Sequence, residues 1–204
     1  ASMRNSSEKI IWGITCFNHD SSICVVIDNR VVLFQSERKH TVTKTMIENA
    51  LKFGEPDMVC YYENMWLKRS RQFLTMDWIR LVKTPSIKEY LGRFGIKAPI
   101  YYSKHHESHA SAAFYTSEFS DCLILVADAI GEWETLTVWS ANENGMTKLL
   151  SKCYPYSLGL FYSAFTDLLG LKPNQEEYIM MGMAGYGNHL KYLKKVNDYF
   201  PSIY

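Results

Sequence analysis

Three short apolar runs separated by two polar turns open the chain and limit what it can fold into. The runs are residues 9–17, 23–27 and 31–35, and all three are rich in side chains that favour strands. Residues 18–22 and 28–30 between them are polar and suit turns. Because short turns join neighbouring strands in opposite directions, the sequence predicts an antiparallel meander.

Beyond the meander, helical periodicity alternates with short apolar strands. We expect helices over residues 43–53, 64–82, 86–94, 106–119, 158–170 and 189–198, and strands over 58–62, 99–102, 122–127, 136–140 and 146–150. A turn at residues 142–145 makes the last two strands a hairpin. This succession indicates an α/β fold, with a mixed sheet and flanking helices.

The charge and cysteine content exclude several classes of protein. The 204 residues carry 22 Lys and Arg against 21 Asp and Glu, a net charge of +1, so we expect no nucleic-acid partner. Five scattered cysteines without a C-x-x-C pair indicate free thiols in a reducing cytoplasm, rather than disulfides or a thiolate metal site. No apolar run is long enough to span a membrane. Ala1-Ser2 before Met3 is typical of a cloning remnant, so residues 1–8 are expected to be a tag scar and a disordered N-terminus.

The densest cluster of chemically active side chains is Lys104 to His109, with three of the six histidines. If a helix begins here, His105 and His109 lie one turn apart on one face, and His106 points elsewhere. Two imidazoles at this spacing can share a metal ion such as Zn²⁺ or Fe²⁺. A single residue separates Glu107 from His109, so the segment is not the H-E-x-x-H of metalloproteases. The alternative is a helix start that carries histidines by chance.

Asp128 is a second candidate, because it ends the apolar strand over residues 122–127 and precedes Gly131. A carboxylate at a strand end beside a glycine turn can bind a metal, and the turn's N–H groups can meet a phosphate. The alternative is an ordinary turn aspartate.

The first turn of the meander carries His19, Asp20, Ser21 and Ser22. Small hydroxyl residues and turn N–H groups can cradle a phosphate, and His19 can serve as an acid or base near neutral pH. The alternative is a polar turn in which Asp20 bonds to its own backbone.

A series of segments, taken in order, resembles the N-terminal part of the NodU/CmcH-type O-carbamoyltransferases. The segments are Gly13-Ile14 with His19-Asp20-Ser21-Ser22, Glu37-Arg38, Tyr62-Glu63, His105-x-x-x-His109-Ala110, Asp128-x-x-Gly131-Glu132-Trp133, Ser157-Leu158-Gly159-x-x-Tyr162 and Met181-Gly182-Met183-Ala184-x-Tyr186-Gly187. The resemblance covers nearly the whole chain. It implies the actin, Hsp70 and sugar-kinase (ASKHA)-like fold, with residues 9–150 as the first lobe and residues 151–204 as the start of the second.

The same resemblance implies roles for individual residues. His105 and His109 match metal ligands, Asp128 matches an acidic catalytic residue near metal and nucleotide, and His19 and Asp20 match catalytic positions near the transferred group. The positions that match nucleotide and cofactor contacts are Ser21, Ser22, Gly131, Glu132 and Gly182. The implied cofactors are a divalent metal, Fe²⁺ foremost with Zn²⁺ or Mg²⁺ as alternatives, and ATP.

The implied reaction moves a carbamoyl group to the hydroxyl of a small-molecule acceptor. The donor is carbamoyl-adenylate, which a YrdC-like domain makes from carbamoyl phosphate and ATP. The chain ends before the family's later metal-ligating Asp, much of its adenine pocket and this YrdC-like domain, and Ile179 stands where a Lys is common before the Met-Gly segment. We therefore expect part of a longer or split enzyme. The alternatives are a non-catalytic nucleotide- and metal-binding subunit, and a kinase or ATPase of the same superfamily.

Overall fold

The computed structural model describes residues 8–17, 20–76 and 86–199. Its elements, in chain order, are β1 (Ile10–Thr15), β2 (Ser21–Ile27), β3 (Arg30–Glu37), α1 (Lys44–Leu51), β4 (Met58–Tyr61), α2 (Met65–Leu74), α4 (Ile87–Gly92), β5 (Ile100–Tyr102), α5 (His105–Tyr115), β6 (Cys122–Ala127), β7 (Glu134–Asn142), β8 (Gly145–Cys153), α6 (Leu158–Leu168), α7 (Glu177–Ala184) and α8 (Leu190–Tyr199).

The first five strands form one mixed sheet in the order β3-β2-β1-β4-β5. β1 pairs with β2, and β2 with β3, in antiparallel directions, whereas β1–β4 and β4–β5 are parallel. Asp28 and Asn29 join β2 to β3, and both have positive φ, which is the conformation that a two-residue hairpin turn requires. The predicted meander is confirmed, and so is the mixed α/β class that the ASKHA resemblance implies.

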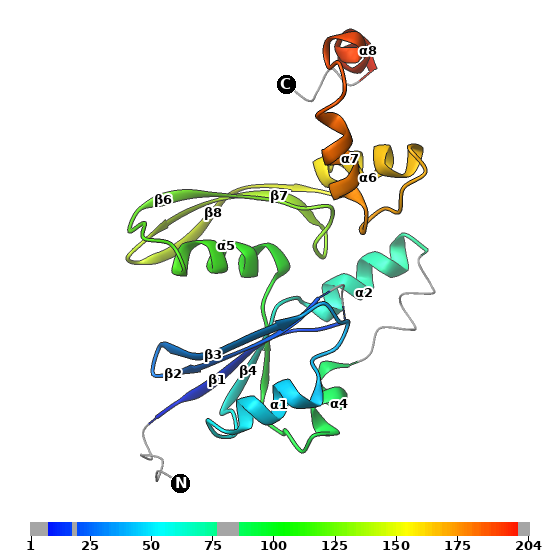
Figure 1. The fold of residues 1–204 in the computed structure, drawn as a ribbon. Coiled ribbons are helices and arrows are strands. Elements are labelled where there is room, and N and C mark those ends of the chain that lie inside the picture. Colours follow the sequence, from blue (N-terminus) through cyan, green and yellow to red (C-terminus); the bar gives the residue numbers. More distant parts are fainter. Residues whose placement is uncertain (1–7, 18–19, 77–85, 200–204) are drawn as a thin grey trace.

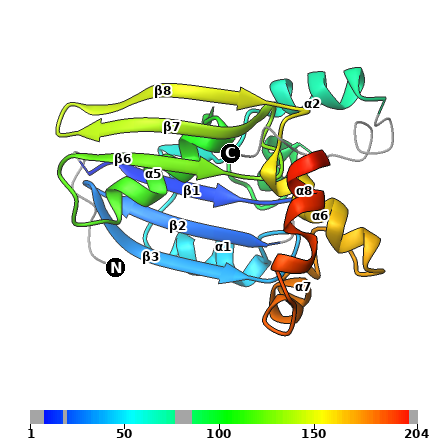
Figure 2. The same ribbon diagram turned by 90° about the horizontal axis from the view of Figure 1, so that it is seen from above.

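A second, antiparallel sheet has the order β6-β7-β8. It begins within residues 9–150, the range that the resemblance assigns to the first lobe. Helix α5 lies against the face of this sheet that is turned toward the first sheet (Figure 1). Helices α6 and α7 lie at one end of these strands, and α8 lies beyond α7, farther from the sheet (Figures 1 and 2). Within the described ranges, no helix has both the length and the apolar character to cross a bilayer.

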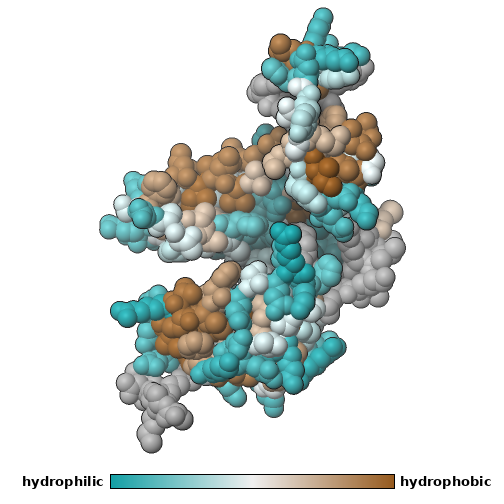
Figure 3. All heavy atoms as spheres, viewed as in Figure 1, coloured by the Kyte–Doolittle hydropathy of each residue, from teal (hydrophilic) through white to brown (hydrophobic). Residues whose placement is uncertain are grey.

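The opposite face of the second sheet is apolar and open. Leu123 is 71% exposed, Leu125 is 67% exposed and Leu150 is 45% exposed. Side chains alternate between the two faces of a strand, so β6 presents Ile124 and Val126 to α5 and its leucines outward. Figure 3 shows this hydrophobic band along the outer side of the sheet.

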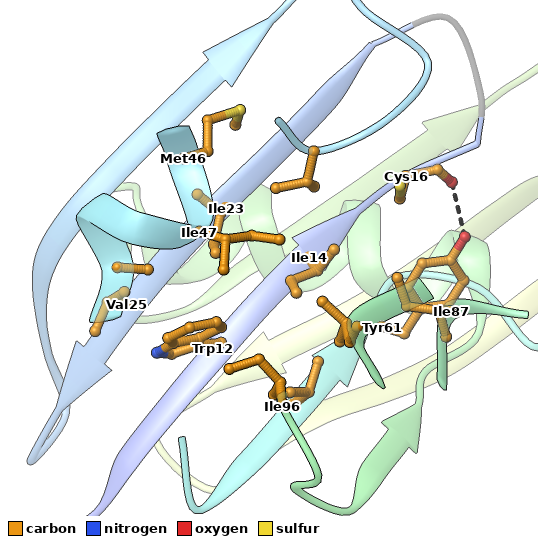
Figure 4. Packing of buried hydrophobic residues seen from close by; sticks show 14 of the residues in the cluster. Trp12, Ile14, Cys16, Ile23, Val25, Met46, Ile47, Tyr61, Ile87 and Ile96 are labelled. Carbon is orange, nitrogen blue, oxygen red and sulfur yellow. Dashed lines mark hydrogen bonds between the residues drawn. The ribbon is translucent and has the colours of Figure 1, made fainter. Parts of the chain in front are cut away.

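The main core lies under the first sheet, where alternate residues of β1 point toward α1 and α4. Ile10, Trp12 and Ile14 are almost fully buried, and they pack with Ile47 of α1 and Ile87 of α4 (Figure 4). The intervening residues of β1 are only half-buried. This alternation shows which face of β1 covers the core, and the strand order β3-β2-β1-β4-β5 makes β1 the central strand of the sheet.

The largest differences from the predicted bounds lie in α2, in the hairpin of the second sheet and in α5, which ends at Tyr115 rather than at residue 119. The helix expected over residues 64–82 ends at Leu74, and residues 77–85 lie outside the described ranges. Each hairpin strand extends beyond its predicted bounds, since β7 and β8 pair from Glu134 with Cys153 to Asn142 with Gly145. Polar side chains such as Thr135 and Lys152 belong to the ladder as well, which an apolar pattern does not detect.

Candidate metal centre

Two histidines and one aspartate are brought together by a helix and a strand. Helix α5 begins at His105, so His109 follows one turn later on the same face, as the spacing predicts. Asp128 comes directly after β6, and β6 packs against α5 through Ala110, Ile124 and other buried side chains. The end of the strand is thereby placed beside the start of the helix.

The three side chains converge on one point. His105 Nε2 lies 2.7 Å from Asp128 Oδ2 and 3.1 Å from His109 Nε2. His109 Nε2 lies 3.8 Å from the same carboxylate oxygen. His105 is 90% buried at its side chain, whereas the side chain of His109 is 55% exposed. The cluster is therefore anchored on one side and open on the other.

The donor set fits a metal ion. A point about 1.9 Å from all three atoms lies in the plane of their triangle, close to the ~2.0–2.1 Å of metal–imidazole bonds. An ion slightly outside that plane reaches all three donors. Among the described residues, this trio is the group of histidine, cysteine and acidic side chains that could hold a metal.

The electrostatics of the cluster suit a cation. The hydrogen bond from His105 holds the pKa of the Asp128 carboxyl at about 2, although burial opposes this. Burial lowers the pKa of His109, and the neighbouring His105 lowers it further, although Asp128 acts in the opposite direction. Near neutral pH, His109 is therefore neutral with a lone pair to donate, and Asp128 is an anion.

His106 points away from the cluster, as expected from its position on the helix. It is fully buried, and its Nδ1 lies 3.0 Å from Thr137 Oγ1. The indole N–H of Trp139 donates to the same hydroxyl oxygen at 2.8 Å. His106 thus fastens the first turn of α5 to β7, which keeps the cluster's helix on the second sheet.

The loop after Asp128 closes tightly on α5. Gly131 is buried, and a Cβ on it would lie 3.1 Å from His105 Cβ and 3.1 Å from His106 Cδ2. The next residue, Glu132, turns its carboxylate inward, where it accepts hydrogen bonds from the backbone N–H groups of Asn64 and His105. Both residues therefore contact the histidine helix directly.

Helix α6 approaches the other side of Asp128. Ser157 caps α6 by accepting from Leu160 N, and its hydroxyl lies 2.6 Å from Ala129 O. A Cβ on Gly159 would lie only 2.5 Å from the backbone of Ala129, so this approach requires glycine. In the sequence, the Ser157-Leu158-Gly159 motif is the feature that contains this required glycine. An open pocket of about 360 Å³ lies here, lined by Ala129, Gly159, Tyr162, Ser163, Asn174 and Glu177.

Among the remaining predicted site residues, His19 is outside the described residues. The others lie apart from the cluster's contacts. The prediction that Ser21 and Ser22 lie in the turn is wrong, because both pair within the sheet as the first residues of β2. Ser21 donates to Thr41 O at 3.0 Å, Ser22 Oγ lies 2.9 Å from Thr15 Oγ1, and Asp20 is exposed. Gly182 lies in α7, exposed, with nothing within 4 Å of an added Cβ. The described contacts join none of Asp20, Ser21, Ser22 and Gly182 to His105, His109 or Asp128.

Comparison with known proteins finds one family model and several similar proteins that match the region of this cluster. A family model described as carbamoyltransferase N-terminus matches residues 64–199, which include both histidines and Asp128. The protein sll1178 of Synechocystis is 30% identical over 92% of this chain and 36% of its own length. The nodulation protein NolNO of Sinorhizobium fredii is 28% identical over 84% of this chain and 28% of its own length.

The similarity extends to an archaeal protein and to a solved structure. MJ1051 of Methanocaldococcus jannaschii is 25% identical over 95% of this chain and 38% of its own length. The chain thus spans well under half the length of the curated relatives that it matches. YeaZ from Pseudomonas aeruginosa aligns with a TM-score of 0.42 and 9% identity, over 72% of this chain and 68% of its own.

Proposed function

Because this chain belongs to the carbamoyltransferase N-terminus family, we propose that it is the N-terminal part of an ATP-dependent carbamoyltransferase. The observation that supports this most directly is the convergence of His105, His109 and Asp128 inside the matched region. The proposed reaction transfers a carbamoyl group to an acceptor hydroxyl, with carbamoyl-adenylate as the donor formed from carbamoyl phosphate and ATP.

His105, His109 and Asp128 would hold one divalent cation. Two imidazoles and one carboxylate with open positions form the ligand set of many Fe²⁺ sites, and Zn²⁺ accepts the same donors. When bound, the cation would act as a Lewis acid, which neutralises phosphate charge and polarises a carbonyl group. The exposed side of His109 leaves the approach to the cluster open for a substrate.

The family resemblance supports the other assignments. His19 is proposed as the base that takes the acceptor's proton, with Asp20 beside it. Ser21, Ser22, Gly131 and Gly182 are proposed to face the nucleotide. The greater length of the curated relatives supports a further proposal, that the rest of the second lobe and a YrdC-like domain complete the enzyme on the same or another polypeptide.

Metal analysis tests the cation site. The purified chain is loaded with Fe²⁺ under anaerobic conditions, or with Zn²⁺, and bound metal is measured by mass spectrometry after desalting. We expect His105→Ala and His109→Ala to abolish retention, and His189→Ala, at an exposed histidine outside the cluster, to leave it unchanged. Equal retention by all four proteins would contradict the site.

A reconstituted reaction tests the chemistry. The chain is combined with the remaining segment of a longer relative, ATP, carbamoyl phosphate and an alcohol acceptor, and products are identified by mass spectrometry. We expect the acceptor to gain a carbamoyl group, and His105→Ala to abolish this gain. Transfer of phosphate instead would indicate a kinase, and metal binding without transfer to any acceptor would favour a non-catalytic subunit.

A further inference from the structure

Glu132 is a buried carboxylate bonded to the starts of two helices. It is 3% exposed. Its Oε1 accepts from Asn64 N at 2.6 Å and from His105 N at 3.0 Å, and its Oε2 lies 3.1 Å from His105 N. Asn64 is the N-cap residue of α2, and His105 is the first residue of α5. One side chain therefore contacts both helices at their N-terminal ends.

The helix start explains why an acidic residue is stable in this position. The first N–H groups of a helix lack partners within the helix, and the helix dipole places partial positive charge there. Lys104, the N-cap residue of α5, makes no capping hydrogen bond with its side chain. Glu132 supplies the missing acceptor from another element, and the helix dipole favours its negative charge.

Asp128 and Glu132 both bond to His105, one at its side chain and the other at its backbone. Asp128 reaches the imidazole of His105, and Glu132, four residues later, reaches the backbone N–H of the same residue. Gly131 lies against His105 Cβ between them. The loop from Asp128 to Glu132 is therefore fixed at both ends to one histidine, so the distance between imidazole and carboxylate depends on Glu132.

We propose that Glu132 is a positioning residue of the metal centre. It holds His105 at the distance from Asp128 that a shared cation needs, and it ties the centre to α2 through Asn64. This role rests on the proposed cation site. It differs from the nucleotide contact that the family resemblance implies, because both carboxylate oxygens are bonded to backbone N–H groups.

Co²⁺ titration of the 204-residue chain tests the proposal, because the visible absorption of Co²⁺ reports the geometry of its ligands. We expect Glu132→Ala to weaken Co²⁺ affinity by about 10- to 100-fold, the usual effect of removing a group that orients a metal ligand, and to change the spectrum. Glu132→Gln retains one acceptor oxygen at the same reach, so its affinity and spectrum should lie between those of Glu132→Ala and the unaltered chain.

Thr43→Ala is the matched control. It removes the hydrogen bond from Met46 N to Thr43 Oγ1 at the start of α1, a helix cap in the first-sheet half of the chain. It should lower the midpoint of urea denaturation and leave the Co²⁺ spectrum and affinity unchanged. If a general loss of stability weakened Co²⁺ binding, the affinity and spectrum would change in all three variants. If Glu132 positions the metal ligands, they change only in the two variants at Glu132.

The outcomes separate the two claims. Failure of the unaltered chain to bind Co²⁺ would overturn the cation site, and the positioning role with it. Binding by the unaltered chain, with the same affinity and spectrum in Glu132→Ala, would overturn the positioning role alone. If Glu132→Ala does not fold by circular dichroism, Glu132→Gln decides: an unchanged affinity and spectrum in that variant would overturn the role.

Discussion

At the scale of single residues, the charge of Asp128 depends on a neighbour. The hydrogen bond from His105 holds the pKa of the Asp128 carboxyl at about 2, below its ordinary 3.8. The folded chain therefore binds this proton less readily than the unfolded chain does. The resulting stabilisation is fully present above the ordinary pKa and is lost as pH falls toward 2.

Acid denaturation of the metal-free chain checks this dependence. With a chelator present, the free energy of unfolding in urea should fall between about pH 5 and about pH 2, as the unfolded chain takes up the proton first. Asp128→Asn lacks the titrating group, so its stability should fall less over the same interval. An identical decline in both proteins would show that Asp128 is not held as an anion by the fold.

Two glycines should respond in opposite ways to alanine. In Gly159→Ala, the new Cβ would meet the Ala129 backbone at 2.5 Å, and we expect a loss of about 1–3 kcal/mol or more in urea denaturation. Gly182→Ala adds a methyl group to an exposed helical position with nothing within 4 Å, so stability should stay constant or rise by up to about 1 kcal/mol. Equal effects would contradict the close approach of α6 to Asp128.

At the scale of the secondary-structure elements, one buried hydroxyl links β4 to the end of β1. Tyr61 is fully buried and donates to Cys16 O at 2.7 Å (Figure 4). Tyr61→Phe leaves that carbonyl buried without this partner, so we expect a loss of about 1–3 kcal/mol in urea denaturation. Tyr101→Phe, at a residue 55% exposed on β5, is the control and should have little effect. Equal stability of the two variants would show that the bond contributes nothing.

The elements themselves were largely predictable, because local periodicity encodes them. The alternation of Ile10, Trp12 and Ile14 in β1 corresponds to one buried face, and the spacing of His105 and His109 corresponds to one turn of α5. The approach of Asp128 to that pair depends on packing between α5 and β6, which no periodicity encodes; the ordered motifs of the family resemblance were the only sequence signal for it. The Glu132 bond spans 68 positions to Asn64, and neither periodicity nor the motifs indicate it.

At the scale of the whole molecule, the outer face of the second sheet should make the chain associate. Its leucines form an exposed apolar band (Figure 3), and β6 pairs on only one edge among the described strands. Such faces promote contact between molecules. We expect the apparent mass in analytical ultracentrifugation to rise with protein concentration, and Leu125→Lys to reduce that rise without loss of fold.

Tyr186→Lys is the control for charge alone. Tyr186 is 97% exposed and lies away from the sheet, after α7. The same added charge should leave association unchanged there. Association that is absent in the unaltered chain, or equally reduced by both substitutions, would contradict a role for this face.

The position of the donor residues along the chain has a consequence for the order of folding. One short stretch of the chain contains His105, His109 and Asp128. The pairing of β1 with β4 joins strands that are separated in sequence by β2, β3 and α1. Closing a short loop costs less chain entropy, and contacts that are local in sequence form fastest. The three donors can therefore meet while the first sheet is still incomplete. The bond from Glu132 to Asn64 comes later, as the step that joins a preassembled helix–strand unit to the rest of the chain.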